Sequence, residues 1–557
     1  MKTYTTNHNN DTVRFCDGKN SKTWRSLALA ALVLLTTVSY SSAQSLSSSK
    51  RKPMTYSPTT CWVSPTGGNG CMSPQYRSGA YGSAPGSTYN ANLTGNPVGD
   101  KNVLNPQKVN SSSMGLLTSI ESPWVAAGNT QGGCQPSNTG GQLLPTASVS
   151  VESRILFPAL DANGNCALFT YDVTYPSDAQ YVAELGTTNP HVTASPGYNG
   201  DVVIGAEDGN VYSYEWASTT LDWTFTDPYP GWGFDSSPTT WPGLAYVYVV
   251  DTGGNIFYLN PGNGQAAFTI NSPINPGGNN VVPVSASSLA VSTASNMVFL
   301  AGTDAYGNTN GDEVCAYNAT TAASAWTACQ TFSGNLTAQN NLIGSSPVVS
   351  DSLGLVFVTD QPQYLQGTNS TNLYALEVNN NGTVRWNVSL IPTPGSPWDS
   401  YSPLPYGGSP AYDDSANNGS SKYVITVSPY SCYYSYGHGY PCGEFSAIQV
   451  FNALNGNLVC SGYTSHIISQ SSPEVVDGVI YVGTDDGYVL AYDETKCSSG
   501  SLPNIWTSST GNSCGSGPCP MDSPLEGPPV VSYNRIHAVS ENGTLYVWNR
   551  CDAAGCW

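Results

Sequence analysis

Short apolar runs separated by Asp-Gly or Asn-Gly pairs recur along the chain. In the clearest copy, apolar residues 479–483 precede the pair Asp486-Gly487, apolar residues 489–493 follow it, and Trp506 comes next. This order predicts two antiparallel strands joined by a tight turn, and then a third strand that begins at the aromatic residue. Similar copies lie at residues 201–214, followed by Trp223, and at residues 535–548.

Each repeat opens with a Ser-Pro step or a close variant, about 40 to 60 residues after the previous one. Proline suits the first residue of a strand, where no N–H is lost from the ladder. The steps are Ser195-Pro196, Ser237-Pro238, Ser346-Pro347, Ser409-Pro410 and Ser472-Pro473, with the variants Ser287-Ser288 and Pro528-Pro529. Further strand pairs are expected at residues 154–157 with 167–171, 245–250 with 255–259, 297–302 with 314–317, 355–359 with 373–378, and 423–427 with 447–451.

Together the repeats predict an all-β fold, an eight-bladed β-propeller of four-stranded antiparallel blades. The last repeat shows three strands before Asn549. We expect residues 115–128 to supply its fourth strand, because this pairing removes an open sheet edge. Aromatic residues recur near the ends of five repeats, and we expect them to pack between neighbouring blades. They are Trp223, Phe268, Trp326, Trp386 and Trp506.

The pattern Tyr-Val-Gly-Thr-Asp-x-Gly-x-Val-x-Ala-Tyr-Asp of residues 481–493, with Trp506 after it, resembles the pyrroloquinoline-quinone-type repeat. Quinoprotein alcohol dehydrogenases share this repeat with non-catalytic relatives such as the outer-membrane assembly lipoprotein of the Bam complex. The resemblance covers about residues 150–549. It implies the propeller fold, but it does not imply an activity, because the repeated residues are structural ones.

The first 43 residues are typical of a secretory signal. Basic residues, among them Arg14 and Arg25, precede the apolar run 27–38, and Ser41-Ser42-Ala43 fits a cleavage site. The alternative is a type II membrane anchor with the propeller outside the cytosol. Residues 44–113 are rich in Ser, Gly and Pro and are expected to be a surface linker, followed by the propeller at residues 114–557.

Charge and cysteine content favour the secretory pathway. The formal net charge of −20 disfavours binding to nucleic acid and to anionic lipid. Cys16 lies in the leader, so an even number of cysteines remains for disulfides. Close pairs are Cys61/Cys71, Cys315/Cys329, Cys432/Cys442, Cys514/Cys519 and Cys551/Cys556, while Cys134, Cys166, Cys460 and Cys497 have no deducible partner. Asn-x-Ser/Thr sequons at Asn92, Asn110, Asn318, Asn335, Asn369, Asn381, Asn387, Asn418 and Asn542 indicate a glycoprotein.

Two Trp/Asp clusters and one further aspartate are the candidate site. Asp235, Asp399 and Asp522 each precede the first strand of a repeat, and the first two follow Trp232 and Trp398. Such connections cross the face where the central channel of a propeller opens, so we expect the three carboxylates to bind Ca²⁺ there. Trp232 and Trp398 are the candidates for stacking on a quinone cofactor. The alternative is that each aspartate caps a turn. The segments 161–165 and 308–313 also resemble Ca²⁺ loops, but turn chemistry explains them first.

These patterns leave more than one function open. We expect a secreted or cell-surface glycosylated propeller, monomeric, that acts as a binding or scaffold module for an unidentified protein or glycan. A lectin-like propeller that stacks surface aromatics on sugars is a variant of this expectation. The alternative class is a pyrroloquinoline-quinone-dependent dehydrogenase of alcohols or sugars. Many such enzymes carry a disulfide between adjacent cysteines, and this chain has no Cys-Cys pair.

Overall fold

The computed structural model describes most of the chain after residue 103. The described residues are 104–110, 113–129, 149–151, 154–172, 179–184, 195–196, 201–206, 208–215, 220–231, 233–234, 237–240, 244–251, 253–271, 288–303, 312–332, 341–342, 346–362, 371–390, 399–403, 409–413, 421–434, 441–468, 471–510, 521, 525, 527–532, 535–540, 542–552 and 555–556. All of them belong to one compact unit. The expected signal and most of the expected linker lie outside the described residues.

Within the described residues, the strands form eight sheets, and every pairing between successive strands is antiparallel. The first four sheets in chain order are β2 (Val149–Val151), β3 (Arg154–Leu160), β4 (Cys166–Asp172) and β5 (Ala179–Glu184); β6 (Ser195–Pro196), β7 (Asp201–Gly205), β8 (Asn210–Glu215) and β9 (Leu221–Thr226); β10 (Val247–Val250), β11 (Asn255–Leu259) and β12 (Ala266–Asn271); and β13 (Ala290–Ser292), β14 (Met297–Thr303), β15 (Asp312–Asn318) and β16 (Gln330–Phe332). In the three-stranded sheet, a bridge from Thr239 to Tyr248 takes the place of the innermost strand.

The other four sheets include two that carry an additional strand on the inner edge. Their strands are β17 (Asn341–Leu342), β18 (Val348–Ser350), β19 (Leu355–Pro362), β20 (Asn372–Glu377) and β21 (Val384–Ser389); β22 (Asp399–Pro403), β23 (Ala411–Asp413), β24 (Tyr423–Tyr434), β25 (Pro441–Asn452) and β26 (Leu458–Thr464); β27 (Glu474–Val476), β28 (Val479–Gly483), β29 (Val489–Asp493) and β30 (Asn504–Thr507); and β31 (Val530–Ser532), β32 (Arg535–Val539), β33 (Leu545–Asp552), β34 (Gly555–Cys556) and β1 (Met114–Ile120). Two short helices, α2 (Pro123–Ala126) and η2 (Glu494–Ser499), complete the described elements.

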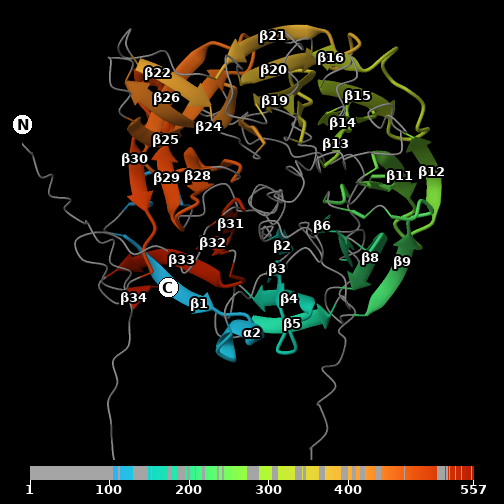
Figure 1. Cartoon of the computed structure of the whole chain (residues 1–557), viewed down its shortest axis with the longest axis horizontal. Helices are drawn as coiled ribbons and strands as arrows, with labels where there is room; N and C mark the ends of the chain where they lie inside the picture. Colours follow the sequence, from blue (N-terminus) through green and yellow to red (C-terminus); the bar gives the residue numbers. More distant parts are fainter. Residues whose placement is uncertain are drawn as a thin grey trace, which may run out of the picture. The chain divides into compact units, whose positions relative to one another are not determined.

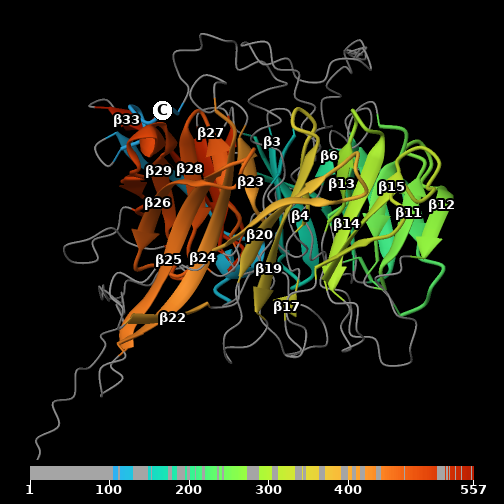
Figure 2. The same ribbon diagram turned by 90° about the horizontal axis from the view of Figure 1, so that it is seen from above.

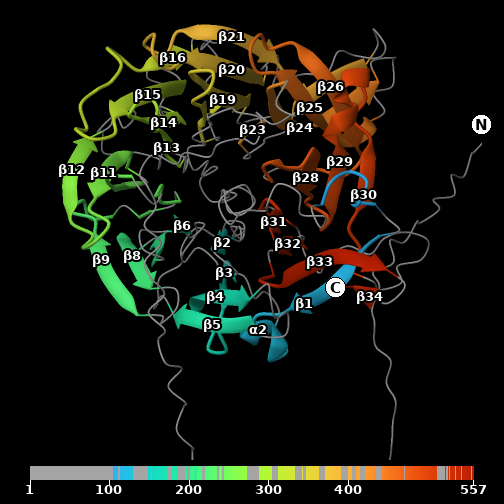
Figure 3. The ribbon, with the colours of Figure 1, turned by 180° about the vertical axis from the view of Figure 1, so that it is seen from behind.

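The innermost strands of successive sheets are neighbours. Contacts run from β13 to β18, β23, β27 and β31 in turn, and β31 also contacts β2. In Figures 1 and 3 the sheets therefore follow one another in chain order around a common centre, with the innermost strands toward it. The buried aliphatic and aromatic residues lie mainly between neighbouring sheets, which is why apolar residues occupy both faces of the inner strands.

The sheet that contains the last strands is closed by the N-terminal strand, as expected. β1 pairs antiparallel with β33, so that Leu116 lies opposite Trp548 and Ile120 opposite Leu545. Figure 3 shows β1 beside β33. The predicted fourth strand is thus confirmed, within residues 114–120.

Tryptophans join neighbouring sheets at their outer strands, which confirms the packing role expected for them. The indole Nε1 of Trp223 donates to the Pro261 carbonyl at 2.9 Å, and that of Trp326 donates to the Val378 carbonyl at 2.8 Å. In both cases the acceptor lies in a turn of the next sheet along the chain. Each turn carries a glycine with positive φ; a Cβ on Gly264 would lie 2.4 Å from Trp223.

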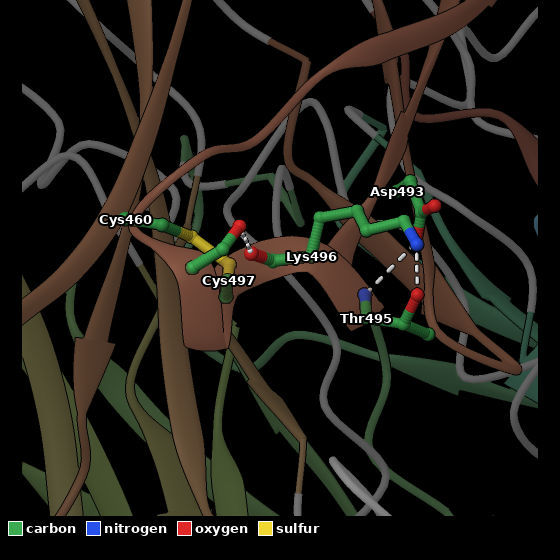
Figure 4. Close-up of a disulfide and its surroundings, with 6 residues drawn as sticks. Cys460, Asp493, Thr495, Lys496 and Cys497 are labelled. Atoms are coloured by element: carbon green, nitrogen blue, oxygen red, sulfur yellow. Dashed lines mark hydrogen bonds between the residues drawn. A yellow bond between two sulfur atoms is a disulfide. The ribbon is translucent and has the colours of Figure 1, made fainter.

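Two disulfides tie described segments together. The bond Cys315–Cys329 confirms a pairing expected from close spacing. Cys460 and Cys497, whose partners could not be deduced, bond to each other and join β26 to η2 of the next sheet (Figure 4). Cys166 is also disulfide-bonded. A local pairing rule could not find Cys460–Cys497, because the two residues lie 37 positions apart in different repeats.

Part of the expected surface linker is packed against the propeller instead. Leu104 and Val109 are buried in the same cluster as Trp506 and Trp548. Residues 104–110 of the expected linker therefore pack against the sheets through Leu104 and Val109. Among the described residues, no helix has the length and apolar character needed to span a bilayer.

Candidate functional site

A belt of buried serines marks the end of the sheets where each innermost strand begins. The Ser237 N–H donates to Ser288 Oγ at 3.0 Å, and the Ser288 N–H donates in turn to Ser346 Oγ at 2.9 Å. The series continues from Ser346 to Ser409 at 2.9 Å and from Ser409 to Ser472 at 2.8 Å. The hydroxyls of Ser288, Ser346, Ser409 and Ser472 therefore each satisfy a backbone donor of the preceding sheet, while Ser237 contributes its N–H. We call these five residues the serine belt, and the end of the sheets that they mark the connection face.

The connections that reach this face are fixed to the turns between the second and third strands. The Phe234 N–H donates to the Ala206 carbonyl at 3.0 Å, and the Leu525 N–H donates to the Thr484 carbonyl at 3.1 Å. Ala206 and Thr484 hold the same place in their turns, so Phe234 and Leu525 are equivalent. Asp235 and Glu526 therefore follow equivalent residues, and Glu526 is a candidate that the sequence expectation missed in favour of Asp522.

The predicted site residues themselves fall almost entirely outside the described part of the chain. Trp232, Asp235, Trp398 and Asp522 are not described, and of Asp399 only the backbone is. Asp399 is the first residue of β22 and lies opposite Tyr434 at the far end of β24. The convergence of the three carboxylates on a Ca²⁺ ion stays a prediction.

The register places Asp399 well away from the start of the innermost strand. Ala411 of β23 pairs with Ile425, whereas Asp399 pairs with Tyr434, nine residues further along β24. At about 3.3 Å per residue this is roughly 30 Å along the strand. Asp399 can therefore lie close to Asp235 only if this extended part of the sheet bends toward the central channel.

A pair of buried carboxyl groups lies at the connection face between two sheets. Asp251, in the turn after β10, accepts hydrogen bonds from the backbone N–H of Asn255 at 2.7 Å and from its Nδ2 at 2.6 Å. Asp227, just after β9, accepts from the Tyr229 N–H at 2.8 Å. Burial raises the pKa of Asp227 to about 7, and the neighbouring Asp251 adds to this shift. Below about pH 7, Asp227 is therefore mostly protonated and shares its proton with Asp251.

A projecting arm is the largest departure from the regular sheets. β24 and β25 have 12 residues each, and β22 pairs only with the far half of β24. We call residues 399–403, 429–434 and 441–446 the arm; Figure 2 shows it extending beyond the other sheets. At its base, Tyr430 is buried, its ring centre lies 5.5 Å from that of Phe445, and Phe445 lies 6.1 Å from Tyr463, which is 58% exposed.

Two other oxygen-rich or metal-like groups have structural roles. The Asp161 carboxylate accepts from the N–H groups of Asn163 and Asn165 at 2.8 Å each. Although burial acts to raise it, these bonds hold the pKa of Asp161 below its usual value, which confirms turn chemistry for this loop. Glu313, Cys315 and Cys329 cluster as metal ligands would, but the two cysteines form a disulfide and offer no thiolate.

Comparisons with known proteins identify the fold. No family model matches the sequence, and no curated protein matches it. A europium-containing methanol dehydrogenase superimposes with a TM-score of 0.51 at 11% identity, covering 80% of this chain and 94% of the other. The quinohemoprotein alcohol dehydrogenase ADHIIG from Pseudomonas putida HK5 also gives 0.51, at 10% identity over 80% of this chain and 77% of the other. The fold is a β-propeller like the folds of these two dehydrogenases.

BamB from Moraxella catarrhalis matches with 14% identity and a TM-score of 0.47, over 78% of this chain and 97% of BamB. The two dehydrogenase superpositions confirm the resemblance inferred from the repeat for the fold alone, because identities this low carry nothing further. We call each of the sheets described above a blade.

Of the aromatic residues around the expected quinone site, the structure describes Phe234 but neither Trp232 nor Trp398. Phe234, the described aromatic residue beside Trp232 and Asp235, has no exposed area, and its ring lies 5.9 Å from that of Phe257. It is part of the core between blades and is not available to stack on a planar cofactor. A quinone site would depend on Trp232 and Trp398, and we derive no chemical step through it.

Proposed function

We propose that this chain is a secreted or cell-surface glycoprotein whose eight-bladed propeller acts as a binding or scaffold module. The arm is the observation that carries the binding role. It extends one blade beyond its neighbours, its strand β22 has a partner on one side within the described residues, and the exposed Tyr463 lies at its base. An edge strand with adjacent aromatics suits an extended peptide or a sugar ring.

Disulfides and sequons support the secretory location. The bonds Cys315–Cys329 and Cys460–Cys497 lie within the blades and are typical of an oxidising compartment. Asn387 is exposed on the outermost strand β21, and Asn381 is exposed in the turn before it, so both sequons are accessible to glycosylation. With its net charge of −20, the protein binds a protein or glycan rather than nucleic acid, and it functions as a monomer.

The binding role is tested on arrays of glycans and extracellular proteins. We expect the full chain to bind at least one of the two ligand classes, and Tyr463→Ala to weaken that binding about tenfold, or about 1.4 kcal/mol. Phe268→Ala is the matched control, because Phe268 is an exposed aromatic (37%) on β12, away from the arm. Equal losses in the two variants, or no ligand on either array, would contradict the proposed role.

The competing proposal, a quinone-dependent dehydrogenase of alcohols or sugars, is tested with the same preparation. The full chain is incubated with pyrroloquinoline quinone and Ca²⁺, and dye reduction is followed with a panel of alcohols and aldoses. We expect no reduction above the protein-free control. Dye reduction by the wild type that disappears in Asp235→Asn would favour the dehydrogenase proposal over the binding-module proposal.

A further inference from the structure

A second group of carboxylates lies at the end of the strands opposite the connection face. Asp413 ends β23, Asp477 lies in the turn between β27 and β28, and Glu494 follows β29 and opens η2. Turns after first and third strands lie opposite the face where first strands begin. This group is therefore separate from the predicted site of Asp235 and Asp522, and it bridges two neighbouring blades.

Glu494 is the unusual member of the group. Its side chain is 2% exposed, and neither Oε1 nor Oε2 has a hydrogen-bond donor. Its backbone N–H donates to the Gly478 carbonyl at 2.9 Å, which fixes the residue against the turn that holds Asp477. The side chain lies within hydrogen-bonding reach of the Asp413 carboxyl across the blade boundary. A buried carboxylate without donors requires a proton or a cation.

The surrounding charges favour a cation. Besides Asp413 and Asp477, the acidic residues Asp493 and Glu474 act on this region, and the basic residue Lys108 acts on Asp477. The Asp493 carboxylate is already occupied, because it caps η2 by accepting the Thr495 N–H at 3.0 Å. Burial first, and then Asp413, raise the pKa of Asp477 to about 6 despite Lys108.

The pair Asp227–Asp251 shows what a proton alone accomplishes. In that pair, one oxygen of Asp227 accepts the Tyr229 N–H and the other lacks a donor. One proton shared with Asp251 is therefore enough to satisfy the whole Asp227 carboxyl group. Glu494 has two such oxygens, and a single proton shared with Asp413 leaves one of them unsatisfied. A hard divalent cation bound by both oxygens satisfies the whole carboxylate and neutralises Asp413 as well.

We propose that a calcium ion binds between Glu494 and Asp413, with both oxygens of Glu494 as ligands, and joins the β23–β26 blade to the β27–β30 blade. Calcium accepts six to eight oxygen ligands, so backbone carbonyls and water complete its shell. Asp477 does not bind the ion directly, but its negative charge lies nearby and favours the cation. The ligand type disfavours soft metals, since the two ligand side chains, Glu494 and Asp413, offer only carboxylate oxygens.

The test is a calcium titration of the purified full chain after removal of metal with EGTA. Isothermal titration calorimetry should show a saturable Ca²⁺ site. Tb³⁺ should replace the ion, and its luminescence should be excited through Tyr481, because Tyr481 lies close enough to Asp477 for the Asp477 charge to raise its pKa. Glu494→Gln keeps the shape of the neutral side chain but should weaken Ca²⁺ binding at least tenfold. Asp413→Asn should act in the same direction.

Asp227→Asn is the control, because it alters a buried carboxyl pair at the opposite face and should bind Ca²⁺ as the wild type does. Circular dichroism establishes that each variant is folded before its titration. Absence of Ca²⁺ binding in the wild type would overturn the proposal, and so would unchanged affinity in Glu494→Gln. A site that is lost in Asp235→Asn but kept in Glu494→Gln would assign the ion to the connection face instead.

Discussion

The indole Nε1 of Trp386 donates a hydrogen bond to the carbonyl oxygen of Ala453 at 3.1 Å, across the boundary between two blades. Three residues beyond the acceptor, Gly456 has a φ of +72°, and a Cβ built on it would lie 2.7 Å from the Trp386 ring. The same turn thus provides both the acceptor for the indole and the space that it fills.

Gly456→Ala should therefore destabilise the protein by about 2 to 4 kcal/mol, since it combines left-handed backbone strain with overpacking against an indole. Gly354→Ala isolates the first effect, because Gly354 has a φ of +63° and nothing within 4 Å of a built Cβ. We expect it to cost about 1 kcal/mol. Denaturant unfolding measures the loss of stability in both variants. Equal losses would show that the Trp386 ring moves aside without a measurable loss of stability.

Asp227 predicts a specific pH dependence of stability. Its pKa is about 7 in the folded protein, above the value of 3.8 for the free side chain. The contribution is fully present below pH 3.8 and is lost as the pH rises through 7. Asp227→Asn should be about 1 to 2 kcal/mol more stable than the wild type at pH 8, and this difference should shrink toward pH 4.

Asp161→Asn should show the opposite trend, because the pKa of Asp161 is lowered by its hydrogen bonds. Its stabilisation is present above the free value and is lost on acidification. Thermal unfolding decides the matter, between pH 4 and 8 for Asp227→Asn and from about pH 5 down to about pH 2 for Asp161→Asn. Parallel pH profiles for the two variants would show that neither carboxyl is perturbed as described.

The segment before β1 should stabilise the propeller. Leu104→Ala removes a buried side chain from the cluster around Trp506 and should cost about 2 to 4 kcal/mol. Gln107→Ala, in the same segment but exposed, should change the free energy of unfolding by less than about 0.5 kcal/mol. Urea melts of the full chain compare the two. Similar, small effects would mean that residues 104–110 separate easily from the blades.

The serine belt predicts that the serine of a Ser-Pro step contributes more to the free energy of unfolding than the proline does. Ser409→Ala removes the acceptor of the Ser346 N–H and leaves a buried donor unpaired, which should cost about 1 to 3 kcal/mol. Pro410→Ala keeps the hydroxyl and should cost less than about 1 kcal/mol. Chemical denaturation gives both values, and a larger loss for Pro410→Ala would assign the Ser-Pro step to backbone restriction.

The sequence predicted the strands well because each repeat contains its own apolar runs, turn residues and an aromatic residue near its end. The role of Ser288 shows the limit of that reading. The Ser-Pro steps drew attention to proline, whereas Ser288 lacks proline and still takes its place in the belt. The recurring serine was the signal for an interaction between repeats.

Contacts between repeats account for the other differences. Cys460–Cys497, the burial of Leu104 and the pair Asp227–Asp251 each join segments from different repeats, and no pattern within a single repeat specifies them. Asp235, Asp399 and Asp522 lie in connections of unequal length, where the repeat no longer aligns one blade with the next. The equivalent hydrogen bonds of Phe234 and Leu525 align the two connections, and this alignment, which the residue spacing did not provide, points to Glu526.

The pairing of β1 with β33 also sets an order of events during synthesis. β1 is made more than four hundred residues before its partner, so the ring has an open edge until Leu545 and the residues after it leave the ribosome. At 5 to 20 residues per second this interval is roughly 20 to 90 seconds. The bond Cys315–Cys329 joins residues made more than two hundred positions before β33, whereas Cys497 precedes β33 by about fifty. The first bond therefore has the longer time to form on a chain whose two ends have not yet met.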